Sequence, residues 1–158
     1  GLALAAAIGA RLRSDGGWAL IIDYGFETEG GFEAEGGFEA ASGLSLQAVR
    51  RHRGSDILER PGETDLSAHV DFTALARATG MPTFGPTGQG DFLRRLGIAH
   101  RAEALKARAT LPQRQAIDAA LARLIDPDQM GTLFRVLAVG DTPSSEPPGF
   151  SDSFPSTT

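Results

Sequence analysis

The strongest constraint on the fold of this chain is an uninterrupted apolar run that ends in a polar turn. Trp18-Ala19-Leu20-Ile21-Ile22 shows no alternation of apolar and polar residues, and Asp23-Tyr24-Gly25 follows it directly. Such a run is typical of a strand in a parallel sheet whose two faces are both covered by helices. Open α/β sheets bind ligands at the carboxyl ends of their strands. The sequence therefore predicts a buried strand that delivers an acid and a phenol to a ligand-binding edge.

The segments on either side of this strand predict an α/β fold. Leu4, Ile8 and Leu12 recur at helical spacing before Gly16, which predicts a helix that leads into the strand. A second, nearly continuous apolar run extends from Thr132 to Val139 and favours an edge or final strand of the same sheet.

The region between the two strands is predicted to be mostly helical. Asp71 is a good N-cap for a helix that ends before Gly80, and Thr110 with Gln113 forms a capping box. Further helices are predicted over 91–96, 99–109 and from 111 to Asp126, with a short strand over 82–87.

Composition narrows the class of protein. At 158 residues and 41% hydrophobic, the chain suffices for one domain or part of one. The net charge of −5 argues against a nucleic-acid partner, and the lack of cysteine excludes disulfides and thiolate sites. No apolar run approaches the roughly 20 residues that cross a bilayer, so we expect no membrane insertion. We expect a bacterial cytoplasmic protein and no metal site.

Two segments differ in composition from the rest. A Gly-Phe-Glu hexapeptide repeat lies within 26–45, which predicts a solvated loop, with an acidic Ca²⁺ site as the alternative. Residues 141–158 are rich in Pro and Ser and predict a disordered tail, which leaves 1–140 as the domain.

Five blocks, in this order, resemble the MidA-type family of class I S-adenosylmethionine (SAM)-dependent methyltransferases. That family includes a mitochondrial protein arginine methyltransferase that assists assembly of respiratory complex I. The blocks are Leu20 to Gly25, Leu46 to Arg53, Pro61 to Phe72, Gln89 to Leu93 and Met130 to Phe134.

The resemblance implies the C-terminal half of a Rossmann-like methyltransferase sheet with a helical insert. In the family, a glycine-rich turn and an acidic strand end hold the methyl donor, and neither element is in this sequence. We therefore expect SAM to be bound mainly by an N-terminal half that is absent here, and this chain alone to be inactive. The expected substrate is a protein, with a subunit of a respiratory complex as the candidate; the oligomeric state stays open.

Candidate site residues follow from chemistry and from the resemblance. Asp23 is the first candidate to hold a guanidinium, because Arg pairs bidentately with carboxylates, although it could simply cap the turn. Tyr24 lines the substrate channel or packs as a core aromatic. His69 is a proton acceptor or a structural residue, and Asp65 would shape the wall of the pocket.

A basic cluster supports an alternative function. Arg50 and Arg53 begin and end an Arg-Arg-His-Arg run that would contact an acidic protein partner, or else is a solvated surface. The chain could accordingly be a non-catalytic interaction or assembly module derived from a methyltransferase.

Overall fold

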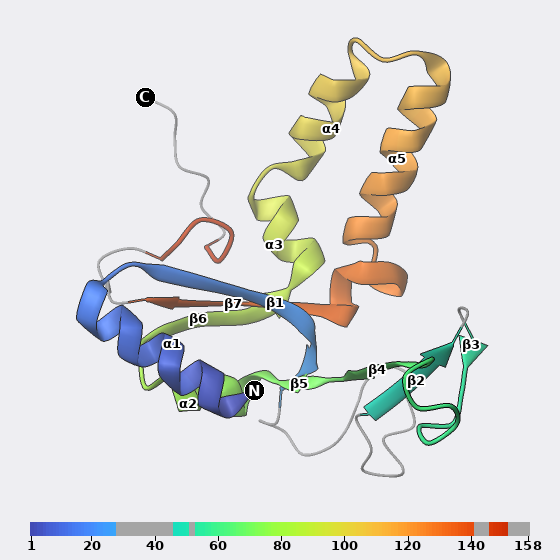
Figure 1. Cartoon of the computed structure of the whole chain (residues 1–158). Coiled ribbons are helices and arrows are strands. Elements are labelled where there is room, and N and C mark those ends of the chain that lie inside the picture. Colours follow the sequence, from blue (N-terminus) through green and yellow to red (C-terminus); the bar gives the residue numbers. More distant parts are fainter. Residues whose placement is uncertain (28–45, 51–52, 141–145, 152–158) are drawn as a thin grey trace.

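The computed structural model describes residues 1–27, 46–50, 53–140 and 146–151. Within these ranges a four-stranded sheet has the order β5-β1-β7-β6, and a three-stranded sheet has the order β3-β2-β4 (Figure 1). The strands are β1 (Trp18–Phe26), β2 (Leu46–Arg50), β3 (Arg53–Gly54), β4 (Asp65–Ala68), β5 (Val70–Asp71), β6 (Thr83–Gly88) and β7 (Phe134–Gly140). The helices are α1 (Leu2–Asp15), α2 (Phe72–Thr79), α3 (Gln89–Arg95), α4 (Ile98–Lys106), α5 (Leu111–Ile125) and the π-turn η1 (Pro127–Gly131). The predicted α/β class is confirmed.

The four-stranded sheet is mixed. β1 pairs antiparallel with β7 from Trp18 opposite Gly140 to Tyr24 opposite Phe134. β5 adds to β1 in parallel at Gly25 and Phe26, and β6 pairs antiparallel with β7. The prediction that 132–139 forms an edge or final strand is confirmed in part: β7 is the last strand of the described residues, but it lies between β1 and β6 and is not an edge strand. A near-continuous apolar run is in fact what an internal strand needs.

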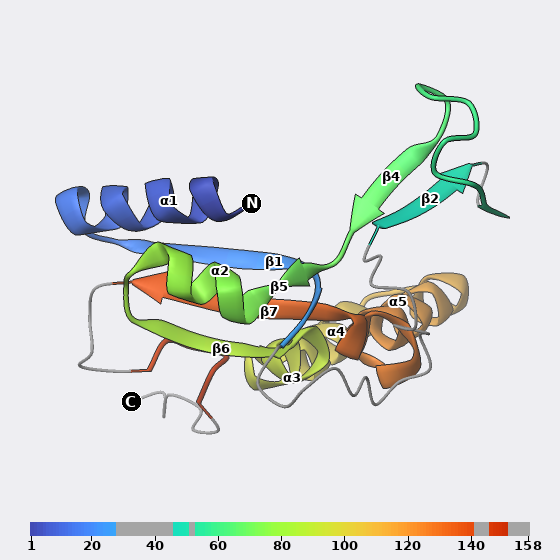
Figure 2. The same cartoon turned by 90° about the horizontal axis from the view of Figure 1, so that it is seen from below.

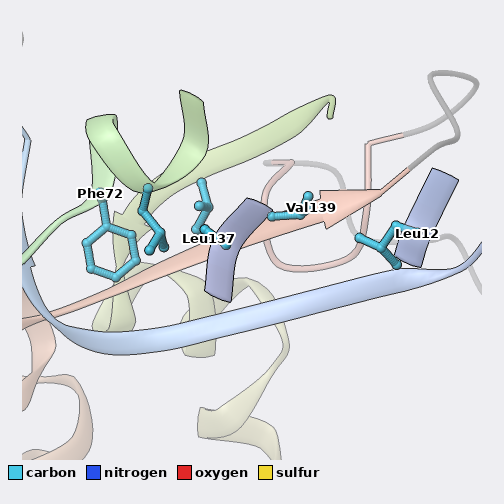
Figure 3. Packing of buried hydrophobic residues seen from close by; sticks show 6 residues of the cluster. Leu12, Phe72, Leu137 and Val139 are labelled. Atoms are coloured by element: carbon cyan, nitrogen blue, oxygen red, sulfur yellow. The ribbon is translucent and has the colours of Figure 1, made fainter. Parts of the chain in front are cut away.

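Helices α1 and α2 cover one face of this sheet. Leu12 and Phe72 pack there against Leu137 and Val139 of β7 (Figure 3). The two helices approach closely at Gly9, where an added Cβ would collide with the Thr79 carbonyl of α2. The Arg13 guanidinium donates to the carbonyls of Thr79 and Gly80 at 3.2 and 3.0 Å, which ties α1 to the end of α2.

The opposite face is covered only in part. Phe92 of α3 and Phe150 pack on Val136 and Ala138 of β7. The neighbouring β1 side chains on that face stay open: Trp18, Leu20 and Ile22 are 43%, 52% and 46% exposed. The prediction that both faces of this strand are buried is therefore wrong for the part of the chain that the structure describes. An unalternating run supplies apolar side chains to both faces, but it cannot specify which elements cover them.

The three-stranded sheet was not predicted. β2 and β4 pair from Leu46 opposite Ala68 to Val49 opposite Asp65, and the sheet projects away from the larger one (Figure 2). The segment 65–71, for which no strand was predicted, forms β4 and β5, with His69 between them. All four residues of β4 are exposed, so its sequence lacks the one-sided apolar pattern by which strands are recognised.

The helical predictions are confirmed in position and in their caps. The Asp71 carboxylate accepts from the backbone N–H of Ala74 at 3.0 Å, and Gly80 ends α2 in the left-handed conformation. The Gln113 side-chain oxygen accepts from the backbone N–H of Thr110 at 2.9 Å. Helices α4 and α5 then form a hairpin that rises from the sheet (Figure 1). None of the helices in the described ranges is long and apolar enough to span a membrane.

Two predicted irregular regions fall largely outside the described residues. This holds for 28–45, which contain most of the Gly-Phe-Glu repeat, and for 141–145 and 152–158 of the predicted tail. Residues 146–151 differ from the tail prediction, since Phe150 is only 8% exposed and its ring centroid lies 5.3 Å from that of Phe92. One aromatic side chain in a polar segment suffices for this packing.

Replacing Phe72 by Ala should lower the free energy of unfolding by about 3 to 5 kcal/mol, because a fully buried ring would leave a cavity between α2 and the sheet. Urea denaturation measures this change. The control Leu58→Ala, at a side chain 82% exposed, should shift stability by less than about 0.5 kcal/mol. Equal effects of the two changes would contradict the assigned core.

Lys106 holds the helical hairpin together through hydrogen bonds from its ammonium group to Asp118 and Glu103, each at 2.7 Å. These bonds raise the pKa of Lys106 above its ordinary value of 10.5. A raised pKa in the folded state means that the stabilisation is complete below pH 10.5 and disappears as the pH rises through the higher folded value.

Lys106→Met should therefore lower Tm at pH 7, and the difference from the unmodified chain should shrink only above pH 10.5. Thermal melts at several pH values test this. Arg123→Met, at an exposed position on α5, is the matched control and should change Tm little. A difference that disappears already near pH 8 would show that the ammonium group is not the cause.

Candidate active site at the carboxyl end of strand β1

An aromatic cluster forms where β1 ends and β7 begins. The Tyr24 ring lies 4.1 Å from that of Phe134 between centroids, tilted by 37°, and 6.5 Å from the His69 ring in an edge-on arrangement. Tyr24 stays 40% exposed, and His69 is half-buried between β4 and β5. The structure thus brings together two of the predicted site residues that are 45 positions apart in the sequence.

Asp23 precedes Tyr24 on the same strand and therefore points to the other face of the sheet. Its carboxylate accepts a hydrogen bond from the backbone N–H of Tyr24 at 2.8 Å. The residue is exposed, so its second oxygen is open to solvent or to a ligand. The turn-capping and ligand-binding interpretations are compatible, because the carboxylate can accept several hydrogen bonds.

The predicted turn at Asp23-Tyr24-Gly25 is wrong, because β1 continues through Phe26. Within the strand, Gly25 has no space for a side chain. An added Cβ would lie against the Val70 carbonyl oxygen and 2.5 Å from the Phe72 ring. The close approach lets β5 pair with β1 at this point, and β5 follows His69 directly. Gly25 therefore controls how near His69 comes to Tyr24.

The remaining predicted site residues lie in the projecting sheet. Asp65 is the exposed first residue of β4, Arg53 is exposed in β3, and Arg50 of β2 stands opposite Arg53 in register. Asp65 and His69 are four positions apart along an extended segment, a distance of about 13 Å. The predicted set therefore divides into a cluster at the end of β1 and a group on the second sheet.

Two contributors near the site were not predicted from the sequence. Phe134 forms one wall of the aromatic cluster, and the Arg135 guanidinium lies 3.8 Å from the Glu27 carboxylate just beyond the end of β1. Arg135 stands opposite Asp23 in the β1 and β7 register. The sequence shows Arg135 as the one charged residue in an apolar run, but it does not show that this run pairs with β1.

Surface hollows do not coincide with this site. One lies between α4 and α5 beside Leu105 and Ile117, and a larger one of about 820 Å³ lies on the small sheet beside Val49 and Leu58. Neither is lined by Asp23, Tyr24 or His69. Among the described residues, no group of three or more His, Asp or Glu side chains could hold a metal ion. Asp23, Tyr24 and His69 form one open wall of a site and do not enclose a molecule as large as SAM.

The segment that builds this wall matches a known family. Residues 1–87 match the family described as "putative S-adenosyl-L-methionine-dependent methyltransferase". This range contains β1 with Asp23, Tyr24 and Gly25, and also β4, β5 and α2. The chain belongs to this family. The resemblance inferred from the five sequence blocks is thereby confirmed.

Curated relatives agree with this assignment. The chain is 36% identical over 133 residues to the mitochondrial protein arginine methyltransferase NDUFAF7 homolog of Drosophila melanogaster, and 31% identical over 137 residues to protein arginine methyltransferase NDUFAF7 of Danio rerio. These matches cover 82% and 85% of the chain. The chain spans only 28% and 30% of the length of those relatives.

Solved structures show the same fold. An uncharacterised protein from Burkholderia thailandensis matches 96% of the chain and 38% of its own length, with a TM-score of 0.72 and 28% identity. A second crystal structure from that organism, with S-adenosyl-homocysteine bound, matches 96% of the chain and 36% of its own length, with a TM-score of 0.69 and 28% identity. The described fold thus matches a part of the larger folds of these two proteins.

Gly25→Ala should lower the free energy of unfolding by about 1 to 3 kcal/mol, because the new methyl group has no space between Val70 and Phe72. Gly54→Ala in β3 is the matched control, since nothing lies within 4 Å of its added Cβ. Chemical denaturation of both variants measures the difference. A Gly25 variant as stable as the Gly54 variant would contradict the close packing of β5 on β1.

Proposed function

We propose that this chain forms the acceptor side of a SAM-dependent methyltransferase that modifies an arginine of a protein substrate. The observation that carries the proposal is the family match over residues 1–87, which contains the exposed Asp23 and Tyr24 at the end of β1. The names of the curated relatives, which are protein arginine methyltransferases, support the choice of acceptor. A subunit of a respiratory complex is a candidate substrate.

The methyl donor would be held mainly by residues outside this sequence. SAM supplies an electrophilic methyl group on a sulfonium, so the protein has to position the nucleophile and accept its proton. The glycine-rich turn and acidic strand end that the family resemblance assigns to the donor are not among these 158 residues. A Burkholderia relative was solved with S-adenosyl-homocysteine bound, which supports donor binding by proteins of this kind.

Asp23 would hold the guanidinium of the acceptor. A guanidinium presents a planar fork of N–H donors that fits a carboxylate, and the open oxygen of Asp23 is available for it. Tyr24 would provide a flat aromatic wall, on which a guanidinium can stack. Asp23 and Tyr24 point to opposite faces of the sheet, so the acceptor would have to lie across the end of β1. There His69, edge-on to Tyr24, would accept the proton that methylation releases.

Asp65, Arg50 and Arg53 would contact the protein substrate away from the reacting atoms. They lie on the projecting sheet, which also exposes Leu58 and Leu66 to 82% and 55%. Exposed apolar residues beside basic ones suit the surface of a protein partner.

The same sheet favours the second candidate function, a non-catalytic docking module. A projecting sheet with exposed Arg53 and Leu58 can bind a partner whether or not methyl transfer occurs. The two functions differ in whether they need Asp23: methyl transfer would use its carboxylate to hold the acceptor, whereas docking through the projecting sheet would not.

This chain by itself should show no tight binding of SAM in isothermal titration, because the residues proposed to hold the donor are outside it. The Burkholderia relative that binds S-adenosyl-homocysteine serves as the positive control. Micromolar affinity of the isolated chain would overturn the proposed division between donor and acceptor sides.

In a polypeptide that joins this chain to the donor-binding residues, Asp23→Asn should lower kcat/KM for a peptide arginine about 10²-fold, since a neutral amide holds a guanidinium poorly. Asp15→Asn, at the far end of α1, is the matched control and should leave kcat/KM unchanged. Methylation is measured by mass spectrometry of the peptide. Full activity of the Asp23 variant would exclude it from acceptor binding.

Replacing Arg50 and Arg53 together by Gln should reduce the capture of the protein substrate, or of any docking partner, in a pull-down. Arg11→Gln with Arg123→Gln, two exposed arginines on α1 and α5, is the control with the same change in charge. Loss of capture with unchanged methylation of a short peptide is expected for a docking role. Unchanged capture would argue against any contact through the basic cluster.

A further inference from the structure

The hairpin of α4 and α5 rises from the four-stranded sheet with part of its apolar surface exposed (Figure 1). None of the 15 residues of α5 is buried, although the helix contains several leucine and isoleucine side chains. Leu105 of α4 and Leu111 of α5 are 45% and 70% exposed. A helix normally packs its apolar stripe against a neighbouring element, and a pair of helices leaves part of both stripes open. The hairpin therefore has room for a further element.

A hollow of about 410 Å³ lies between the two helices near the tip of the hairpin. Apolar side chains form most of its lining, together with one arginine and one glutamine: Leu105, Ala109, Ala116, Ile117, Arg108 and Gln113. The hollow is separate from the candidate active site, because none of the candidate site residues lines it. Its composition suits an apolar side chain of a partner.

The charge of the hairpin is opposite in sign to that of the whole chain. Residues 98–125 contain four arginines and one lysine against one glutamate and one aspartate, whereas the chain has a net charge of −5. Both acids, Glu103 and Asp118, lie 2.7 Å from the ammonium group of Lys106. No carboxylate among the described residues pairs with the four exposed arginines, which are Arg101, Arg108, Arg114 and Arg123. The hairpin thus keeps an unbalanced positive charge.

Two of these arginines lie beside the hollow. Arg108 is part of its lining. The Nε of Arg114 donates to the carbonyl of Ala109, another lining residue, at 3.1 Å. This bond uses only Nε, so the two terminal nitrogens of Arg114 can still donate to a carboxylate. An apolar hollow beside two arginines is complementary to an apolar side chain that has acidic neighbours.

We propose that the hairpin of α4 and α5 is a docking surface for an acidic amphipathic helix of a protein partner. The apolar face of that helix would lie on Leu105 and Ile117 over the hollow, and its carboxylates would pair with Arg108 and Arg114. Amphipathic helices commonly bind in apolar grooves of this kind. The interaction requires neither Asp23 nor methyl transfer, so it goes beyond the proposed function.

A protein partner fits the hairpin better than a nucleic acid does. Residues 98–125 contain no Phe, Tyr or Trp. Single-stranded nucleic acids bind through aromatic side chains that stack on the bases, in addition to positive charge. The net charge of −5 also opposes a long polyanion, whereas a short acidic helix meets mainly the local charge, because salt screens exposed charges beyond about 10 Å.

The probe is a fluorescein-labelled synthetic peptide of about 18 residues, or five helical turns, with Leu along one face and Glu elsewhere. Fluorescence anisotropy with the full chain should show saturable binding that weakens as the salt concentration rises. NMR should show the largest amide shifts of the unmodified chain within residues 105–117. A second peptide with Lys in place of every Glu should bind at least about tenfold more weakly.

Substitution of the apolar lining tests the contact with the hollow. Leu105→Asp should weaken peptide binding about tenfold, because it puts a charge where the apolar face of the peptide would lie. Leu4→Asp, at a residue 66% exposed on α1, is the matched control and should bind the peptide like the unmodified chain. Circular dichroism checks that each variant is folded.

Substitution of the two arginines tests the charge pairing. Arg108→Gln with Arg114→Gln should also weaken binding about tenfold, since two ion pairs with the peptide would be lost. The control with the same change in charge is Arg11→Gln with Arg60→Gln, two exposed arginines outside the hairpin. The control should leave the affinity unchanged.

Four results would overturn the proposal: no saturable binding, amide shifts outside α4 and α5, equal binding of the Lys peptide, or equal loss in a variant and its control. Tighter binding of heparin or of a single-stranded RNA than of the acidic peptide would assign the hairpin to polyanions and overturn it as well. The same holds for self-association of the chain through Leu105 that prevents peptide binding. Each of these failures would leave the proposed methyl transfer unaffected, because no readout depends on Asp23.

Discussion

The pairing of β1 with β7 is the interaction on which the rest of the described structure depends. It joins a strand near the start of the chain to one more than a hundred residues later, and seven residue pairs hold it. The buried β7 side chains Leu137 and Val139 then form the surface on which α1 and α2 pack. Without this pairing the aromatic cluster would not exist, because Tyr24 and Phe134 meet as its last pair.

The candidate site lies where the pairing of β1 with β7 ends. Beyond Tyr24 the pairing of β1 with β7 ends, and β5 pairs with Gly25 and Phe26 at the other edge of β1. His69, in the segment before β5, lies beside Tyr24 at this end of the strand, while Asp23 stays on the opposite face. A ligand that approaches the end of the strand can meet both faces, which is the usual reason that sheet ends bind ligands. Gly25, where β5 pairs with β1, is therefore a structural requirement of the site.

Short-range signals in the sequence were reliable where the physics is local. The N-cap at Asp71, the capping box at Thr110 and the left-handed Gly80 each depend on a few neighbouring residues, and each is present as predicted. The small sheet was missed because β2, β3 and β4 are short, because β3 and β4 are exposed, and because the sheet depends on pairing between separate segments. The division of the predicted site residues between two sheets was missed for the same reason. No spacing in the sequence indicates that Asp65 and Arg53 lie on a different sheet from Tyr24.

The sequence by itself determined the α/β class, the order and caps of the helices, the strand that ends at Asp23-Tyr24-Gly25, and the family. These follow from local propensity, from periodicity and from ordered blocks of residues. Only the tertiary structure decided that β7 is internal, that β1 keeps one apolar face and one edge open, and that Phe134 and His69 surround Tyr24. Register and face cover depend on contacts between residues far apart in the chain, and an apolar run looks the same whether one face or both are covered.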